Sequence, residues 1–384
     1  MAAMSMETAL QALLATLHDA RAQGAALSIR GGGSKAFYAQ QPDGRVLDTR
    51  GLAGVIHYEP SELVVTVGAG TPLAELEALL QRHGQCLPFE PPHFAWSAPG
   101  AATVGGMVAT GLAGPARANV GGVRDYVLGA KIINGQGQQL SFGGQVMKNV
   151  AGYDVSRLMV GALGTLGVIT EVSLKVLPQA PAEATLCFEL PQAQALEQLH
   201  RWGGRPLPLN ASCWVHDDST PGEPGRDLLF VRLRGAAAAV QAATQSMLAE
   251  VSGICMDNAQ AGPDWTLCRN QQLPFFTQAP PGAVLWRLSV PQTAPVLALP
   301  WAPLVEWHGA LRWLWAPAGA RAQLQQAAQA VGGSASVFYA PGQASASQDR
   351  LRVRDATAAA IQARLQREFD PQGLFNPALT PRAA

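Results

Sequence analysis

Apolar residues recur at helical spacing in the first segment of the chain. Four leucines between Ser5 and Arg21 share one helical face, and Gly24 follows where that helix can end. Similar patterns, alternating or continuous, predict the other elements. The predicted helices cover 71–84, 155–160, 193–202, 236–251 and 356–369, and the predicted strands cover 25–29, 55–58, 63–67, 126–133, 138–142, 168–177, 184–190, 213–215, 228–233 and 285–290.

Turn and capping residues fix two of these elements more closely. Thr71 can cap the helix over 71–84, Pro72 suits its first position, and Gly84 suits a left-handed conformation at its end. Asn134-Gly135-Gln136-Gly137 is typical of the tight turn of a β-hairpin. We therefore expect the strands over 126–133 and 138–142 to pair.

The chain divides near Pro178-Gln179-Ala180-Pro181, which is typical of a linker. A length of 384 residues also exceeds one ordinary core. We predict a first domain over 1–178, a smaller α+β domain over 182–340, and a last segment over 350–384. A Ser-, Ala- and Gln-rich stretch over 342–349 is predicted to be a loop.

Composition excludes several classes of function. The formal net charge is zero and only 14% of the residues are charged, so no basic surface for nucleic acid is expected. The start lacks a basic segment followed by an apolar core, and no uninterrupted run of about 20 apolar residues predicts a spanning helix. Five cysteines without a Cys-x-x-Cys pair argue against zinc and iron–sulfur sites and fit reduced thiols in the cytoplasm.

The richest candidate chemistry lies in Arg30-Gly31-Gly32-Gly33-Ser34-Lys35, directly after the strand over 25–29. Glycine runs cost chain entropy, so they are favoured where backbone must approach something closely. Their bare amides can form a concavity that holds an anion, and a pyrophosphate is the natural guest beside two cations and a hydroxyl. The alternative is a plain flexible turn after a strand.

A second stretch, 101–111, consists almost entirely of small residues. It can let a flat aromatic ligand lie against the backbone, or it can be a helix start packed tightly on a sheet. The common signatures are missing: no Gly-x-Gly-x-x-Gly follows the first strand, and no Gly-x-x-x-x-Gly-Lys-Ser/Thr occurs. Ser34 has no histidine and carboxylate at a recognisable spacing, which disfavours a serine hydrolase.

Taken in order, six short motifs resemble the FAD-binding oxidoreductases of the vanillyl-alcohol oxidase type. They are Arg30-Gly31-Gly32-Gly33-Ser34, Thr66-Val67-Gly68-Ala69-Gly70-Thr71, Thr103-Val104-Gly105-Gly106, Val123-Arg124-Asp125-Tyr126-Val127-Leu128-Gly129, Gly164-Thr165-Leu166-Gly167-Val168-Ile169-Thr170-Glu171-Val172 and Leu374-Phe375-Asn376-Pro377. Lys148-Asn149-Val150-Ala151-Gly152-Tyr153-Asp154-Val155 resembles the branch of D-2-hydroxy-acid dehydrogenases. The short length and Trp307-His308-Gly309-Ala310-Leu311-Arg312-Trp313 are most similar to the FAD-binding subunits of bacterial glycolate oxidases.

The resemblance implies a fold and a set of cofactor contacts. The fold is α+β, with a two-subdomain FAD-binding part, a smaller α+β cap domain, and a C-terminal segment that returns to the FAD-binding part. The implied contacts are Arg30, Gly31, Gly32, Gly33 and Ser34 to the pyrophosphate, Thr103, Gly105, Gly106 and Ala109 to the pyrophosphate and isoalloxazine, Gly167, Val168 and Ile169 to the adenosine end, and Asn376 to the flavin ring.

Two departures from the family pattern qualify this interpretation. Many relatives bind FAD covalently through a histidine at the place of Ser34, so a serine there predicts non-covalent FAD. Relatives that oxidise 2-hydroxy acids carry a His-x-His…Asn…His metal and base cluster, whereas the later half here has three separated histidines. His308 and Arg312 could supply a base and a cation, but we favour a position of His308 at a variable surface or interface. No metal site and no catalytic residue is assigned.

The resemblance implies an FAD-carrying subunit of a glycolate oxidase complex that takes part in oxidising glycolate to glyoxylate. Its implied partners are a larger FAD-binding subunit, an iron–sulfur subunit and a small 2-hydroxy acid. The implied location is the cytoplasm, where the complex could lie at the periphery of the inner membrane. A stand-alone 2-hydroxy-acid or alcohol oxidase and a non-catalytic scaffold are the alternatives. Five tryptophans between 286 and 315 could form an interface or fill the second domain's core.

Overall fold

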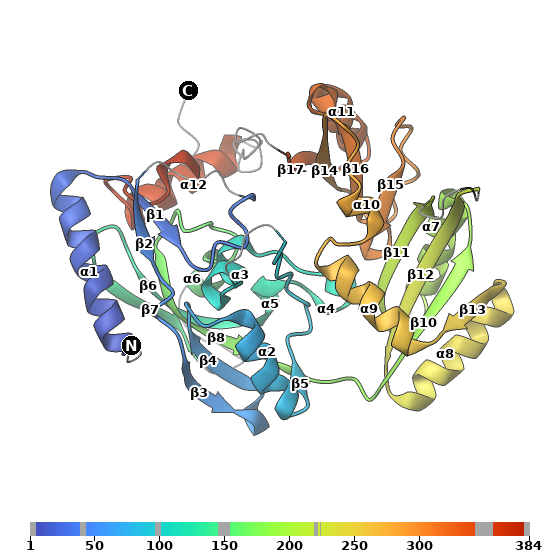
Figure 1. Ribbon diagram of the computed structural model, residues 1–384, viewed down its shortest axis with the longest axis horizontal. Coiled ribbons are helices and arrows are strands. Elements are labelled where there is room, and N and C mark those ends of the chain that lie inside the picture. Colours follow the sequence, from blue (N-terminus) through green and yellow to red (C-terminus); the bar gives the residue numbers. More distant parts are fainter. Residues whose placement is uncertain are drawn as a thin grey trace. The chain divides into compact units, whose positions relative to one another are not determined.

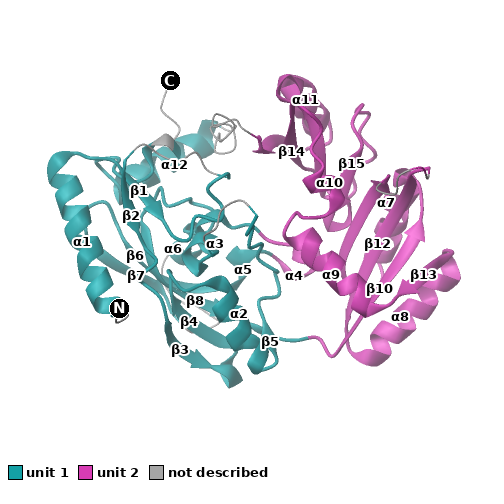
Figure 2. Cartoon of the chain, in the orientation of Figure 1, with its two compact units in different colours: residues 1–112, 122–179, 347–384 teal, residues 113–121, 180–346 magenta. Residues whose placement is uncertain are grey.

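The computed structural model describes residues 5–38, 44–96, 101–144, 154–218, 222, 224–341 and 356–379. The chain forms two compact units (Figure 2). The first contains residues 1–112, 122–179 and 347–384, and the second contains 113–121 and 180–346. The excursion of 113–121 into the second unit is a long-range arrangement for which the sequence carries no local signal.

In the residues that the structure describes, the first unit consists of helices and three sheets (Figure 1). Its helices are α1 (Met6–Gln23), α2 (Leu73–Arg82), α3 (Val104–Thr110), α5 (Val123–Tyr126), α6 (Val155–Leu158) and α12 (Ala356–Phe369). Its strands are β1 (Leu27–Arg30), β2 (Arg45–Asp48), β3 (Val55–Glu59), β4 (Val64–Gly68), β5 (Gln85–Cys86), β6 (Val127–Ile133), β7 (Gln139–Gly143), β8 (Val168–Lys175) and β9 (Leu177–Pro178). The largest of these sheets has the strand order β3-β4-β8-β6-β7.

The C-terminal segment is tied to the first strand of the chain. Leu27 and Phe375 form a parallel bridge, and both side chains lie in a core with Leu17 of α1 and Val168 of β8. Asp370, just after α12, accepts a hydrogen bond from the Phe375 amide at 2.7 Å. Residues at opposite ends of the sequence therefore build one side of the first unit together.

The second unit is organised on an eight-stranded sheet with the order β13-β10-β12-β11-β15-β16-β14-β17. Its strands are β10 (Ala182–Glu189), β11 (Leu209–Asp217), β12 (Arg226–Gly235), β13 (Gly253–Met256), β14 (Ala283–Ser289), β15 (Pro303–Glu306), β16 (Leu311–Pro317) and β17 (Ser334–Tyr339). Its helices are α4 (Arg117–Val120), α7 (Gln192–Gly203), α8 (Ala237–Glu250), α9 (Asn258–Arg269), α10 (Pro274–Thr277) and α11 (Arg321–Ala330).

Helices cover both faces of this sheet. Leu186 of β10 belongs to the same buried cluster as Trp202 of α7 and Met247 of α8. Side chains alternate along a strand, so the neighbouring Thr185 faces the other side. There its hydroxyl accepts a hydrogen bond from the indole N–H of Trp265 in α9 at 2.9 Å.

The tryptophan-rich segment mostly fills the second unit's own core. Trp286, Trp307, Trp313 and Trp315 are each at most 8% exposed. Only Trp301 is intermediate in exposure. Of the two alternatives for this segment, an interface or the second domain's core, the core therefore accounts for four of the five indoles.

The α+β fold class is confirmed, as are the first helix with Gly24 in a left-handed conformation and the hairpin around Asn134. The start of α2 differs from the prediction. Pro72 is its N-terminal cap residue, and the Thr71 hydroxyl is instead hydrogen-bonded to Gly68 O and Gly54 N. Helix α9, which contains Pro263, is an element that the apolar pattern did not predict. The segment Lys148–Tyr153 lies outside the described residues.

Candidate FAD site

A cavity of about 250 Å³ lies in the first unit, around the glycine loop that follows β1. Nine of the thirteen residues predicted to bind the cofactor line it. They are Arg30, Gly31, Gly32, Gly33, Ser34, Thr103, Gly106, Ala109 and Asn376. Three separated parts of the sequence therefore converge on one hollow, as a cofactor-binding site requires.

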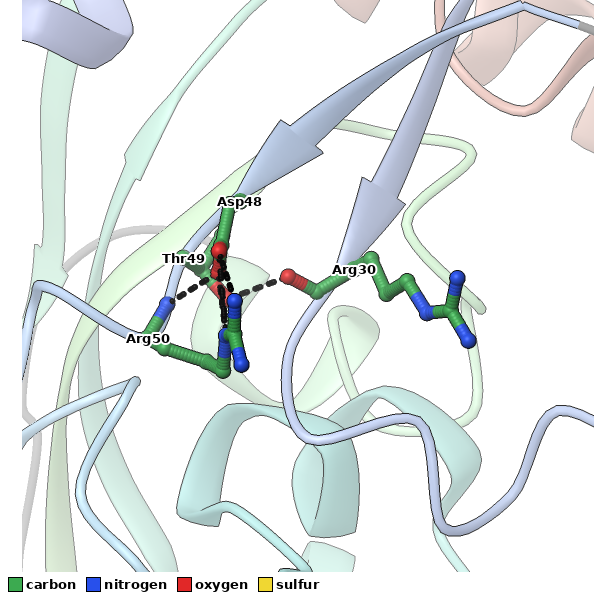
Figure 3. Close-up of polar contacts among 4 residues, drawn as sticks. All are labelled: Arg30, Asp48, Thr49 and Arg50. Carbon is green, nitrogen blue, oxygen red and sulfur yellow. Dashed lines mark hydrogen bonds and ion pairs between the residues drawn. The ribbon is translucent and has the colours of Figure 1, made fainter. Parts of the chain in front are cut away.

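The strand pair β1 and β2 fixes the point where the glycine loop begins. These strands are parallel, and the Thr49 amide donates to Arg30 O at 2.9 Å. The Arg50 side chain is bound to Asp48, and the Arg30 guanidinium points away from that pair (Figure 3). It forms no hydrogen bond or ion pair with any described residue, so its charge is available to an anion in the cavity.

Close packing of the loop against its neighbours, rather than a need for flexibility, explains why residues 31–33 are glycines. A Cβ on Gly32 would lie 1.5 Å from the carbonyl oxygen of Ala101, and a Cβ on Gly31 would lie 2.4 Å from the hydroxyl oxygen of Thr103. Gly33 has φ +78°, which disfavours any larger side chain. The loop is thus held against the segment that leads into α3.

The loop offers the donors and charges that a pyrophosphate needs. Among the described residues, the amides of Gly31, Gly32 and Gly33 donate no hydrogen bond within the chain. Lys35 is buried, with its ammonium 3.4 Å from the Ser34 hydroxyl and 5.9 Å from the Phe94 ring centroid. Unused amides beside Arg30 and Lys35 fit the two negative charges of a pyrophosphate.

The small-residue stretch 101–111 does both things expected from its sequence: it starts a tightly packed helix, and it offers small residues to the cavity. It forms α3, whose Thr103 side chain accepts from the Gly106 amide at 3.2 Å, and Gly105 N donates to Ala69 O at 2.7 Å. Gly105 therefore serves packing, because a Cβ there would lie 2.8 Å from the Ala69 side chain. Gly106 and Ala109 instead face the cavity.

Asn376 links the C-terminal segment to two walls of the cavity. Its side-chain oxygen accepts from the Ile29 amide at 2.9 Å, and its side-chain nitrogen donates to Leu163 O at 2.7 Å. It is 4% exposed and has φ 45°, a left-handed conformation that asparagine tolerates better than most residues. Asn376 thus positions β1 as well as lining the cavity.

The remaining predicted contacts lie outside this cavity. Gly167, Val168 and Ile169 lie at the start of β8, where Val168 and Ile169 pair with Ile133 and Ile132 of β6. The Val168 side chain is fully buried in the core, so it offers only backbone to a ligand. Conversely, Leu163 and Leu379 line the cavity and were not predicted, because nothing local marks them.

The proposed pairing of His308 and Arg312 in the second unit is not supported by their contacts. Arg312 is 1% exposed and donates to three backbone carbonyls, those of Gly309, Pro295 and Ala294, at 3.2, 2.6 and 2.7 Å. Burial lowers its pKa to about 10, which leaves it charged at neutral pH. Three of its five N–H donors, one on each guanidinium nitrogen, are already used, and the side chain is almost fully buried, so it is poorly placed to hold a substrate carboxylate.

His308 is also poorly suited to be the base. The Asn119 amide nitrogen lies 2.6 Å from its Nε2 and donates to it, so the ring proton lies on Nδ1. Burial lowers the pKa of His308 to about 4. The residue is buried at 7% exposure, which corrects the expectation of a surface position. It lies in a tight turn in which Trp307, His308 and Gly309 all have positive φ.

Comparison with known proteins agrees with this geometry. The family model "FAD binding domain" matches residues 7–143. The solved structure of an alkyldihydroxyacetonephosphate synthase covers 96% of this chain and 75% of its own, with a TM-score of 0.66 and 15% identity. At that identity the likeness shows the fold. The family model, with the relatives below, places the chain among the FAD-binding proteins of the vanillyl-alcohol oxidase type, which confirms the predicted cofactor.

Sequence relatives define the family more narrowly. "Glycolate oxidase subunit GlcE" of Escherichia coli (strain K12) is 42% identical over 367 residues, which are 96% of each chain. "D-lactate dehydrogenase" of Archaeoglobus fulgidus is 35% identical over 167 residues, 42% of this chain and 36% of that protein. The chain belongs to the family of glycolate oxidase subunit GlcE.

Neither a metal cluster nor a membrane helix is found in the part of the chain that the structure describes. No group of three or more His, Cys, Asp or Glu side chains there could hold a metal ion. None of its helices is both long and apolar enough to cross a bilayer.

Ser34 gives the first testable prediction. A serine hydroxyl at 3% exposure has no ring nitrogen to bond to the flavin, so we expect dissociable FAD. Precipitating the purified protein with acid should release all of its yellow flavin into the supernatant. Flavin fluorescence that stays with the denatured chain on a gel would contradict this.

Proposed function

We propose that this chain is the FAD-binding subunit of a glycolate oxidase complex and takes part in the oxidation of glycolate to glyoxylate. The observation that carries the proposal is the 42% identity to the GlcE subunit over nearly the whole of both chains. The fit of the glycine loop to a pyrophosphate supports it. When bound, FAD would supply a two-electron acceptor.

The proposal includes two protein partners and a location. Matches to both GlcE and the "Glycolate oxidase subunit GlcD" of Bacillus subtilis (strain 168) support a multi-subunit assembly. We propose a larger FAD-binding subunit and an iron–sulfur subunit, with electrons passing from this chain's flavin to the latter. We further propose a cytoplasmic complex that reaches the inner membrane only at its periphery.

The division of chemistry within the complex follows from His308 and Arg312. Removing the hydroxyl proton of a 2-hydroxy acid requires a base, and its carboxylate requires a cation. His308 Nε2 already accepts a hydrogen bond, and three backbone carbonyls bind all three guanidinium nitrogens of the buried Arg312. We therefore propose that the larger subunit carries out most of the substrate chemistry.

The proposal predicts that the isolated chain reacts poorly with glycolate. The FAD-loaded chain is mixed anaerobically with glycolate, and flavin bleaching is followed by absorbance. Little bleaching is expected alone, with bleaching restored in the assembled complex, while dithionite should reduce both samples. Rapid bleaching of the isolated chain would overturn the division of labour and favour the stand-alone oxidase. A purified chain without flavin absorbance would favour the scaffold alternative.

Co-purification tests the assembly itself. An affinity-tagged chain expressed with its native partners should retain a larger flavoprotein and an iron–sulfur protein, visible by mass and by iron content. Purification of a fully active chain without either protein would contradict the proposed complex.

A further inference from the structure

The second unit contains a cavity of about 550 Å³ that shares no residue with the FAD cavity. It lies on the face of the eight-stranded sheet that α9 and α10 cover, and its volume falls within the usual range of small-molecule sites. We call it the second-unit cavity. Neither the flavin chemistry nor the assembly proposed above uses it.

Aromatic rings form much of its lining. The rings come from Phe230, Trp265, Phe275, Trp301 and Trp315. Two of the indoles are held in place by their N–H groups, since Trp265 donates to Thr185 and Trp315 donates to Phe275 O at 2.6 Å. Ring faces fixed in this way can receive a flat or cationic group with little loss of side-chain entropy.

The charged groups in the lining are acidic. Asp217, Asp218 and Asp264 contribute carboxylates, and no lysine or arginine occurs among the described lining residues. Asp264 is exposed and forms no hydrogen bond or ion pair with any described residue, and its partial burial raises the pKa of its carboxyl. His216 is hydrogen-bonded to Asp227 at 2.7 Å.

One buried arginine lies near this face without lining the cavity. Arg232 is 1% exposed, donates to the Asn210 side chain at 2.7 Å and stacks on the Trp265 ring at 4.7 Å. The protein itself thus places a cation on one indole of the cavity wall. The exposed carboxylate of Asp264 has no cationic partner among the residues that the structure describes.

We propose that the second-unit cavity binds a small organic cation, an ammonium group attached to a flat apolar or aromatic body. The ring faces would hold the body and part of the charge, and the Asp264 and Asp218 carboxylates would pair with the ammonium. An anion of the same shape would be rejected, because it would meet carboxylates and no lysine or arginine among the described lining residues.

Three probes that share a phenyl ring and differ in charge test this. Phenethylammonium, 2-phenylethanol and phenylacetate are titrated into the FAD-loaded protein by calorimetry at pH 7. The cation should bind more tightly than the alcohol, phenylacetate should not bind, and the cation's affinity should fall as salt is raised. Equal binding of all three, or of none, would overturn the proposal.

Two variants locate the site. Asp264→Asn should weaken phenethylammonium binding by about fivefold and leave 2-phenylethanol unchanged, since only charge is removed. Trp301→Ala should weaken both. Glu197→Gln, at an exposed position of α7 on the other face of the sheet, is the matched control and should change neither. An unchanged affinity in Asp264→Asn would place the cation elsewhere. FAD content should be unaffected in every variant, which separates this test from that of the proposed function.

Discussion

Replacing Gly32 with alanine is expected to remove FAD from the purified protein almost as completely as replacing it with valine. The Cβ of the alanine would lie 1.5 Å from the Ala101 carbonyl oxygen. The backbone of residue 32 fixes the Cβ, and the oxygen belongs to the backbone of residue 101. Neither can move without displacing the glycine loop from the segment that leads into α3. We expect FAD binding to weaken by more than about tenfold, as overpacking of this severity implies.

The two substitutions separate two explanations of the glycine. If Gly32 only leaves room for phosphate, alanine should be tolerated and valine should block the site. If the loop must lie against Ala101, both should fail. Flavin absorbance per polypeptide measures this, with circular dichroism to confirm folding. Gly144→Ala, which meets nothing within 4 Å, is the control and should keep full flavin. Full occupancy in Gly32→Ala would contradict the packing explanation.

The place of the glycine loop could be predicted from sequence because its signals are local. A short apolar strand followed by three glycines and two flanking cations is typical of an anion site, with a plain turn after a strand as the alternative. What each glycine packs against could not be predicted. Ala101 and Thr103 come close to Gly31 and Gly32 only after the chain has folded over some seventy residues, and no spacing rule encodes that approach.

Local signals also misled where tertiary contacts override them. Thr71 has the residue type of a helix cap, yet its hydroxyl bonds to Gly54 and Gly68 instead, in a turn between β4 and α2. Pro263 would normally end a helix, but it lies within α9, whose Trp265 and Cys268 are buried against the sheet. Burial of these two side chains favours the helix despite the proline.

The second unit shows why residue type alone is weak evidence for catalysis. His308 and Arg312 are four residues apart and could be read as a base and a carboxylate-binding cation. Their partners decide otherwise, because Asn119 donates to His308 and backbone carbonyls surround Arg312. Asn119 is far away in sequence, in the excursion 113–121 that joins the second unit. The hydrogen bond between Asn119 and His308 could therefore not be predicted from the later half of the sequence alone.

Substituting Asn376 is expected to destabilise the first unit and to release FAD together. Its side chain satisfies the partly buried amide of Ile29 and the buried carbonyl of Leu163. Asn376→Leu would leave both backbone groups without partners and force a bulky residue to adopt φ 45°. The loss of the two hydrogen bonds alone should cost about 2–4 kcal/mol of unfolding free energy.

Asn376→Asp separates positioning from simple bulk. It keeps an oxygen for the Ile29 amide but turns the donor to Leu163 O into a buried carboxylate oxygen, so stability should fall at pH 7 and recover in part at low pH, where the protonated carboxyl can donate. Urea unfolding and flavin retention after gel filtration measure the two effects. Asn258→Asp, at an exposed site in the second unit, is the control and should leave flavin retention unchanged. If Asn376→Leu loses FAD at unchanged stability, then Asn376 acts through direct contact with the cofactor. If the variant loses stability but keeps FAD, then the cavity does not depend on the link that Asn376 makes between β1 and Leu163.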